Sequence, residues 1–317
     1  MAEIAPFSSP GQFYKGNLHT HSNLSDGALP LDQVVNAYRD RGYDFLQMSE
    51  HFVQNFDYPI ADTRPFRGNA FTTILGAELH APETSTGELW HILAAGLPLD
   101  FEPPAEDESG PALARRAADA GAFIAIAHPS WSQLTLEDGN ALDFADAVEV
   151  YNHGCFTGND RGDGWYLMDQ MLRQGHRMTA IATDDAHFGC DDAFGGWVHV
   201  KSESLEPEAL LAGLKAGQFY SSQGPQIHEL TVTKDEVHIV CSPVDTVTVL
   251  CGNSRSATRQ GSSITEATLN ISSLNHFWTG LKASPRKVVE PVPWIRVALV
   301  DHGWRRAWTN PIWLDAL

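Results

Sequence analysis

Two histidines and a carboxylate lie close together near the N-terminus, in the segment from His19 to Gly27. His19 and His21 are two residues apart at the end of a short predicted strand, so their side chains can face one point if the backbone is extended. Asp26 follows, and a turn at Gly27 would return its carboxylate to the same region. Imidazole and carboxylate together suit zinc, manganese or iron. The segment therefore predicts a divalent metal site.

Further residues of the same kind end, or lie on, other predicted strands. They are Glu50-His51, Glu78, His91, His128 and the run Asp184-Asp185-Ala186-His187. Taken singly, each could be a structural histidine or an ordinary acid. In a barrel, however, strand ends converge on one face, where active sites form. Buried carboxylates are costly unless they are paired, and cations would neutralise them, so the set as a whole indicates a metal centre.

Short apolar strands alternate with helical patterns between Lys15 and Ser222. Strands are expected at 16–19, 43–49, 72–78, 89–95, 123–127, 147–151 and 178–183, and helices at 31–41, 111–120, 165–174 and 207–216. This alternation indicates an α/β fold with a mostly parallel sheet, either a barrel or a doubly wound sheet. The Gly- and Asp-rich segment 152–164 is expected to be a loop near the site.

The pattern changes after Gly224-Pro225. Segments 227–232, 236–241, 246–250, 266–271 and 294–300 are β-like and are separated by Ser, Asn, Gly and Thr. We therefore expect two domains, a metal-binding domain over residues 1–224 and a small antiparallel, sandwich-like β module over residues 225–317.

Composition limits the classes of partner. The chain has 317 residues, 43% of them hydrophobic, and a formal charge of −19. Without a basic stripe, neither a nucleic-acid polymer nor an anionic membrane is expected as a partner. No signal-peptide pattern or apolar run of transmembrane length is present, which favours a cytoplasmic protein. No GxGxxG or GxxxxGK[ST] motif indicates a nucleotide cofactor, and no pattern predicts the oligomeric state.

The joint motif set resembles that of the PHP family, named after polymerase and histidinol phosphatase. The resemblance is carried by the run HxHxxxSDG, a strand ending in an acid-His pair, a lone Glu, a His-Pro and an Asp-x-His, and it covers about residues 15 to 222. It implies a distorted, TIM-like (β/α)7 barrel that holds two or three divalent metal ions, with manganese, zinc and iron as the candidates.

Carried over motif by motif, the resemblance implies three metal positions. The first would be held by His19, His21, Glu78 and Asp185. The second would share Glu78 and add His91 and His128. The third would be held by Asp26, His51 and His187, with Asp26 standing where some family members have a His.

Two neighbouring acids are expected to support these ligands. Glu50 stands where many family members have Asp, and we expect it to orient His51. Asp184 precedes the expected ligand Asp185 and is placed in the same supporting set. Arg161 is a candidate for binding an anionic substrate, although a solvated arginine is the alternative. Trp131 could stack on an aromatic substrate or pack in the core.

The resemblance implies a metal-dependent hydrolase, above all a phosphoesterase acting on a small phosphate ester or nucleotide. A water between two metal ions would lose a proton near neutral pH and attack the substrate. Glu78, Asp185 and His187 would be the catalytic group around it. The C-terminal segment resembles one branch of PHP-like metallohydrolases with a β tail, which includes a hydrolase of aryl carbamate esters. Hydrolysis of a carbamate, amide or carboxyl ester is therefore the alternative.

Overall fold

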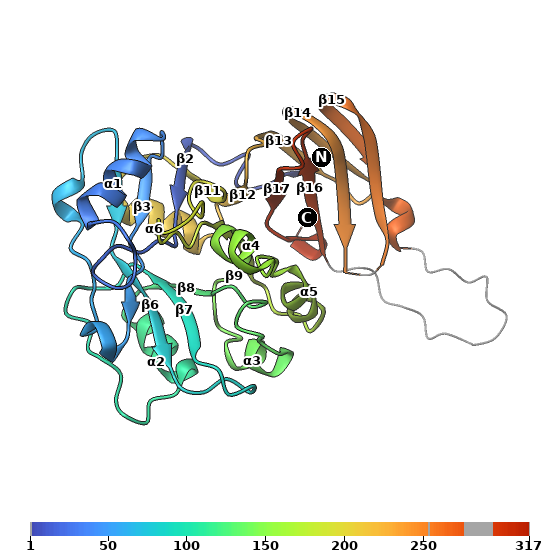
Figure 1. Cartoon of the computed structure of the whole chain (residues 1–317). Helices are drawn as coiled ribbons and strands as arrows, with labels where there is room; N and C mark the ends of the chain where they lie inside the picture. The colour runs from blue at the N-terminus through green and yellow to red at the C-terminus, as the bar shows by residue number, and fades with distance from the viewer. Residues whose placement is uncertain (1, 253, 276–293, 317) are drawn as a thin grey trace. The chain divides into compact units, whose positions relative to one another are not determined.

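The computed structural model describes residues 2–252, 254–275 and 294–316. The chain forms two compact units, one of Pro10–Ser221 and the other of Met1–Ser9 together with Ser222–Leu317 (Figure 1). The first nine residues, which the sequence assigned to the metal-binding domain, thus fall in the C-terminal unit. The reason is that β1 (Ala2–Glu3) pairs antiparallel with β13 (Ile227–Val232).

The larger unit is a mixed α/β structure whose first sheet has the strand order β12-β11-β2-β3-β5. Its strands are β2 (Gln12–Asn17), β3 (Phe45–Gln47), β5 (Thr72–Ile74), β11 (Trp197–Ser202) and β12 (Phe219–Ser222). The strands β2, β3 and β5 are parallel, whereas β11 runs antiparallel to β2. The strand β11 was not expected from the sequence.

The second sheet has the order β10-β9-β8-β7-β6-β4. Its strands are β4 (His51–Phe52), β6 (Gly76–Ala81), β7 (Trp90–Ala95), β8 (Phe123–Ile126), β9 (Ala147–Asn152) and β10 (Thr179–Thr183). Pairing is parallel except at β7, which is antiparallel to both β6 and β8. The first residues of β7 therefore lie at the same edge as the last residues of its neighbours.

Backbone hydrogen bonds extend beyond the named strands and connect the two sheets. The His21 N–H donates to the Ala186 carbonyl at 2.9 Å, and the Asp185 N–H donates to the His19 carbonyl at 2.8 Å. Thr20 and Ala186 form an isolated parallel bridge. Within the described ranges, ladder pairing alone does not close the strands into one barrel, but these bonds place the segments that follow β2 and β10 side by side.

Helices lie between the strands, as the alternation of patterns predicts. They are α1 (Leu31–Asp40), α2 (Gly110–Asp119), α3 (Leu136–Ala141), α4 (His153–Asn159), α5 (Trp165–Arg173) and α6 (Pro207–Lys215). Short 3-10 helices cover Gln54–Phe56, Arg64–Phe66, Ser272–Asn275 and Leu314–Ala316. On α1, Val34, Val35 and Tyr38 are buried, which is the spacing of one helix face.

The expected loop at 152–164 is wrong in part, because it contains α4. Asn152 caps this helix by accepting a hydrogen bond from the Cys155 N–H at 2.8 Å. A helix of seven residues with two glycines has too little apolar periodicity to be detected in the sequence.

The smaller unit is built mainly from antiparallel strands, as predicted. They are β13, β14 (Glu236–Cys251), β15 (Ser256–Asn270), β16 (Trp294–Val300), β17 (Arg306–Thr309) and β18 (Ile312–Trp313). The two strands expected at 236–241 and 246–250 are one strand, β14, whose register shifts near Val244. Its first half pairs with β13 and its second half with β16. Among the described residues, no helix is long and apolar enough to span a membrane.

Candidate metal centre

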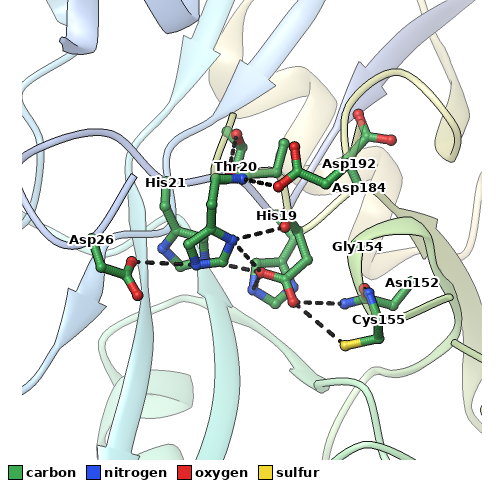
Figure 2. Close-up of polar contacts among 12 residues, drawn as sticks. His19, Thr20, His21, Asp26, Asn152, Gly154, Cys155, Asp184 and Asp192 are labelled. Atoms are coloured by element: carbon green, nitrogen blue, oxygen red, sulfur yellow. Dashed lines mark hydrogen bonds and ion pairs between the residues drawn. The ribbon is translucent and has the colours of Figure 1, made fainter. Parts of the chain in front are cut away.

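The predicted ligand residues, distant in the sequence, come together in the larger unit. They extend from the segments after β2, β8 and β10 and from the strands β4, β6 and β7. His91 is the second residue of β7, and it reaches this region because β7 runs antiparallel to its neighbours. Figure 2 shows three of these side chains, those of His19, His21 and Asp26, gathered in one place.

A first cluster surrounds one oxygen of Asp185. Its Oδ1 atom lies 3.1 Å from Nε2 of His19 and 3.1 Å from Nε2 of His21. Glu78 Oε2 lies 3.5 and 3.6 Å from the same two nitrogens. Bonds of 2.0–2.1 Å to a tetrahedral zinc ion would separate the ligand atoms by roughly 3.3 Å, so the spacing matches that of one bound cation.

A second cluster lies on the other oxygen of Glu78. Oε1 of Glu78 is 2.7 Å from Nδ1 of His91 and 3.1 Å from Nε2 of His128. The buried carboxylate of Glu78 therefore presents one oxygen to each of two ligand groups.

A third cluster is more open to solvent. Oδ1 of Asp26 lies 3.3 Å from Nε2 of both His51 and His187. The ring of His21 lies against both of those rings, with centroids 4.3 and 4.4 Å away. The ligand atoms of these four residues lie close enough together to hold one ion.

Several buried atoms in the clusters lack hydrogen-bond partners. Among the described residues, three such atoms make no hydrogen bond of acceptable geometry: His19 Nε2, His21 Nδ1 and Glu78 Oε2. Buried polar atoms are nearly always paired, and leaving one unpaired costs about 1–3 kcal/mol. A divalent cation would satisfy such atoms, and a set of imidazoles and carboxylates suits zinc, manganese or iron. The residues present thus fit divalent metal ions.

Three groups of the site already hold the ionisation state that metal binding needs. The histidines His19, His51, His128 and His187 do not, because neighbouring carboxylates outweigh burial and raise the pKa of each. Burial acts to raise the pKa of Glu78, but His91, His51 and His19 hold that pKa well below its usual value. Burial lowers the pKa of His21 to about 3 and that of His91 to about 4. An ionised carboxylate and neutral imidazoles are the forms that coordinate metals.

Glu50 plays a different part from the one predicted. Its carboxylate accepts hydrogen bonds from the hydroxyl groups of Ser22 and Ser25, both at 2.5 Å, and from the Ser22 N–H. In the part of the chain described, its hydrogen bonds thus hold the loop between His21 and Asp26 instead of orienting the ring of His51.

Asp184 faces away from the ligand clusters. Tyr38 Oη donates to it at 2.7 Å, and the N–H groups of Phe194, Gly195 and Gly196 donate at 2.8–2.9 Å. Asp184 is fully buried, and burial raises its pKa to about 6. It anchors the segment 194–196 to the strand end that carries Asp185.

A pocket of about 460 Å³ opens onto the clusters. Proposed ligands, Trp131 and small residues such as Gly154 and Gly158 line it. No Lys or Arg is found in this lining among the residues that the structure describes. Arg161 is exposed and does not line the pocket, so the geometry does not support its expected role in binding substrate.

Trp131 lies at the pocket as an exposed aromatic side chain and is not part of the core. Its indole is 41% exposed. Its ring centroid is 5.3 Å from that of His91 and 5.1 Å from that of His128, both in edge-to-face geometry.

Two buried residues at the site were missed in the sequence. Glu149 lies within the apolar strand β9 and contacts His19. His80 lies on β6 and contacts His51. The one available signal was for His80: it is two residues after Glu78, and alternate residues of a strand project from one face.

Comparisons with known proteins give structural likenesses only. No family model and no curated protein matches the chain. One similar solved structure is a two-domain protein from Bacteroides vulgatus containing a predicted PHP-like metal-dependent phosphoesterase. It is 17% identical, the match covers 95% of this chain and 94% of that chain, and the TM-score is 0.49.

Two further solved structures are similar over part of the chain. An amidohydrolase from Chromobacterium violaceum with bound sulfate and no metal is 14% identical, over 56% of this chain and 89% of that one, with a TM-score of 0.42. A proposed metal-dependent phosphoesterase from Bifidobacterium adolescentis is 14% identical, over 63% and 95%, with a TM-score of 0.41. The present chain is itself a mixed α/β protein with His/Asp/Glu clusters of the kind that bind metal ions.

Proposed function

We propose that the chain is a metal-dependent hydrolase with the three-cation site of PHP proteins. The main supporting observation is the buried Glu78 carboxylate, which has histidines near both oxygens and, among the residues that the structure describes, no hydrogen bond of acceptable geometry on Oε2. The proposed ligands are His19, His21, Glu78 and Asp185 for the first cation, Glu78, His91 and His128 for the second, and Asp26, His51 and His187 for the third.

We further propose that the two sheets of the larger unit are halves of one distorted barrel. In support, the segments following β2 and β10 are joined by the bonds at His19, His21 and Ala186 described above. On the other side, β3 of the first sheet and β4 of the second are separated by only three residues of chain. Such closure would gather strand ends from around the barrel onto one face.

The protein's own side chains would place the substrate against the cations. The bound cations would supply positive charge and an acidified water. Glu78 would fix the spacing of the first two clusters, since each of its oxygens belongs to one of them. Asp185 and His187 both line the pocket and would contact the reacting group directly.

A small phosphate ester is the substrate class we favour. Three dications would bring about +6 and the carboxylates of Asp26, Glu78 and Asp185 about −3, which leaves the site near +3. This local charge would attract an anion although the whole chain has a formal charge of −19. The phosphoryl oxygens would be held by the cations, since no basic side chain from the described residues lines the pocket.

Hydrolysis of a carbamate, amide or carboxyl ester is a second candidate. The observation that favours it is the same pocket lining, which within the described ranges contains Trp131 and glycines but no Lys or Arg. An uncharged acyl group needs no basic side chain and could use the same cations as Lewis acids.

The test is a paired substrate screen on protein with measured metal content. Protein loaded with manganese, zinc or iron is assayed against p-nitrophenyl phosphate and a nucleotide panel, and in parallel for release of 1-naphthol from an aryl carbamate. Turnover of phosphate esters alone would support the phosphoesterase, and turnover of the carbamate alone the second candidate. Fully loaded protein that is inactive in both panels would refute the hydrolase.

A further inference from the structure

His80 is a buried histidine that the three proposed ligand groups do not use. It follows Glu78 by two residues on β6, so both side chains project from one face of the strand. The residue is 6% exposed. Its ring centroid is 4.8 Å from that of His51 and 4.3 Å from that of His91.

The contact between His80 and His51 is a hydrogen bond between ring nitrogens. His51 Nδ1 lies 2.8 Å from His80 Nε2. The same Nδ1 also lies 2.8 Å from Glu78 Oε2, yet that oxygen has no hydrogen bond of acceptable geometry among the described residues. A proton on His51 Nδ1 therefore points to His80 and leaves Glu78 Oε2 available to a cation.

The direction of this bond follows from the other nitrogen of His51. Nε2 of His51 faces Asp26 at 3.3 Å, in the proposed third cation cluster. A neutral imidazole carries one proton, so a ring that coordinates through Nε2 must be protonated at Nδ1. His51 is then the donor, and His80 Nε2 is the acceptor.

We propose that His80 is a positioning residue that fixes the tautomer and ring orientation of His51 for the third cation. The proposal rests on the proposed function, because the third cation is part of it. Partners that accept the second N–H of a ligand histidine commonly contribute 10–100-fold to metal affinity. In this site the hydrogen-bond acceptor would be a histidine, where other metal sites often have a carboxylate or carbonyl group.

The competing arrangement is a separate cation held directly by His51, Glu78 and His80. Their ligand atoms are 2.8, 2.8 and 3.6 Å apart, close enough to share an ion. In that arrangement His51 would bind through Nδ1, and its Nε2 would carry the proton and could not serve the cluster at Asp26. The two arrangements therefore predict different losses of metal.

Zinc binding by equilibrium dialysis and metal analysis tests the proposal without an activity assay. His80→Leu introduces an apolar side chain of similar bulk that cannot accept a hydrogen bond. We expect it to weaken the third zinc about 10–100-fold and to leave the other two unchanged. His80→Gln offers an amide oxygen near the position of Nε2 and should bind all three zinc ions within a few-fold of wild type.

Two controls complete the design. His199→Gln alters a partly buried histidine on β11, where the Trp197 indole N–H donates to its Nε2 at 2.9 Å, and should leave zinc binding unchanged. Thermal melting of the metal-free proteins checks the fold. If His80→Leu does not fold, His80→Asn replaces it, because its shorter amide does not reach His51 and should also lose the third zinc.

Asp26→Asn separates the competing arrangements. The single variant Asp26→Asn should lose the third zinc ion. Adding His80→Leu to it should cause no further change in zinc binding. Loss of an additional zinc in the double variant would make His80 a direct ligand and overturn the proposal. Wild-type affinities in His80→Leu would overturn it as well while leaving the proposed function intact. Wild-type protein that binds no zinc would instead refute the proposed function.

Discussion

Oε1 of Glu149 lies 2.9 Å from Nδ1 of His19, and both side chains are fully buried. The other oxygen, Oε2, accepts the backbone N–H of His128 at 2.6 Å and the side-chain amide of Asn152 at 3.0 Å. One carboxylate thus holds the ring of one proposed ligand and the backbone of another. A carboxylate bonded to the distal nitrogen of a ligand histidine fixes its tautomer and makes it more basic.

Glu149→Gln should weaken the first cation position by about 10–100-fold. The amide carries no charge and presents either an oxygen or a competing donor to His19. Burial acts to raise the pKa of Glu149, but His19 lowers it below the usual value, so the carboxylate is ionised in the native protein. Metal affinity by dialysis is the primary measurement, and kcat at saturating metal is the second.

The matched control is Glu137→Gln, which removes an exposed carboxylate on α3. It should bind metal as the wild type does. If Glu149→Gln and Glu137→Gln bind metal equally well, Glu149 does not position His19.

The candidate residues of the clusters could be selected from the sequence because metal chemistry restricts residue type and because strand ends locate them. His19 and His21 follow the strand β2, Asp185 follows the strand β10, and the structure brings all three together. His91 was placed by its strand alone, whereas the physical reason it reaches the site is the antiparallel direction of β7. Whether two strands pair parallel or antiparallel is decided by the tertiary structure, and the sequence of the strand alone does not indicate it.

The supporting residues could not be predicted, because a hydrogen-bond partner is chosen in three dimensions. Glu149 and His19 are 130 residues apart, and Glu149 sits in a strand that otherwise reads as buried and apolar. Glu50 was expected to orient the adjacent His51, but its carboxylate bonds the serines of a distant loop. A strand alternates its side chains, so neighbours such as these two face different surroundings.

Glu78→Gln should reduce turnover at least 100-fold and remove more than one metal ion, because both oxygens of Glu78 face proposed ligands. Metal content and initial rates on the same preparation provide the measurement. Glu88→Gln, an exposed acid in the connection between β6 and β7, should behave as wild type. A Glu78→Gln protein with full metal content and a normal rate would exclude the bridging role.

Asp184→Ala should lower the free energy of unfolding by on the order of 3 kcal/mol, since four donors, two of them in buried hydrogen bonds, would lose their acceptor. Asp184→Asn keeps one acceptor oxygen and should lose less. Denaturant unfolding of the metal-free proteins measures both. Equal stability of Asp184→Ala and wild type would show that the segment 194–196 is held by other contacts.

The metal-free protein should become less stable as pH rises above neutrality, in part through His51. Burial alone would lower the pKa of His51, but Glu78 and Asp26 outweigh it and raise the pKa to about 10. The folded pKa thus exceeds the unfolded value of about 6.5. The stabilising contribution of this proton is complete below pH 6.5 and is lost as pH rises toward 10.

Denaturant unfolding of metal-free wild type and His51→Gln between pH 6.5 and 10 measures this contribution. The wild type should lose more stability across that window than the variant. The same pH dependence in both would mean that His51 does not carry the proton. Because a bound cation would replace this proton, metal binding near pH 8 should also release fewer protons in His51→Gln than in wild type.

Trp131→Ala should reduce kcat/KM for substrates with an aromatic leaving group by roughly 3–10-fold and leave compact alkyl substrates unchanged, since aromatic pairs contribute about 0.5–1.5 kcal/mol. The indole is 41% exposed and lines the pocket, so its removal should not alter the fold. The comparison is between p-nitrophenyl and methyl esters of the same acid. Tyr166→Ala removes a 78% exposed ring that is not part of the pocket lining and is the matched control. Equal losses on both esters would assign Trp131 to support of His91 and His128 rather than to contact with substrate.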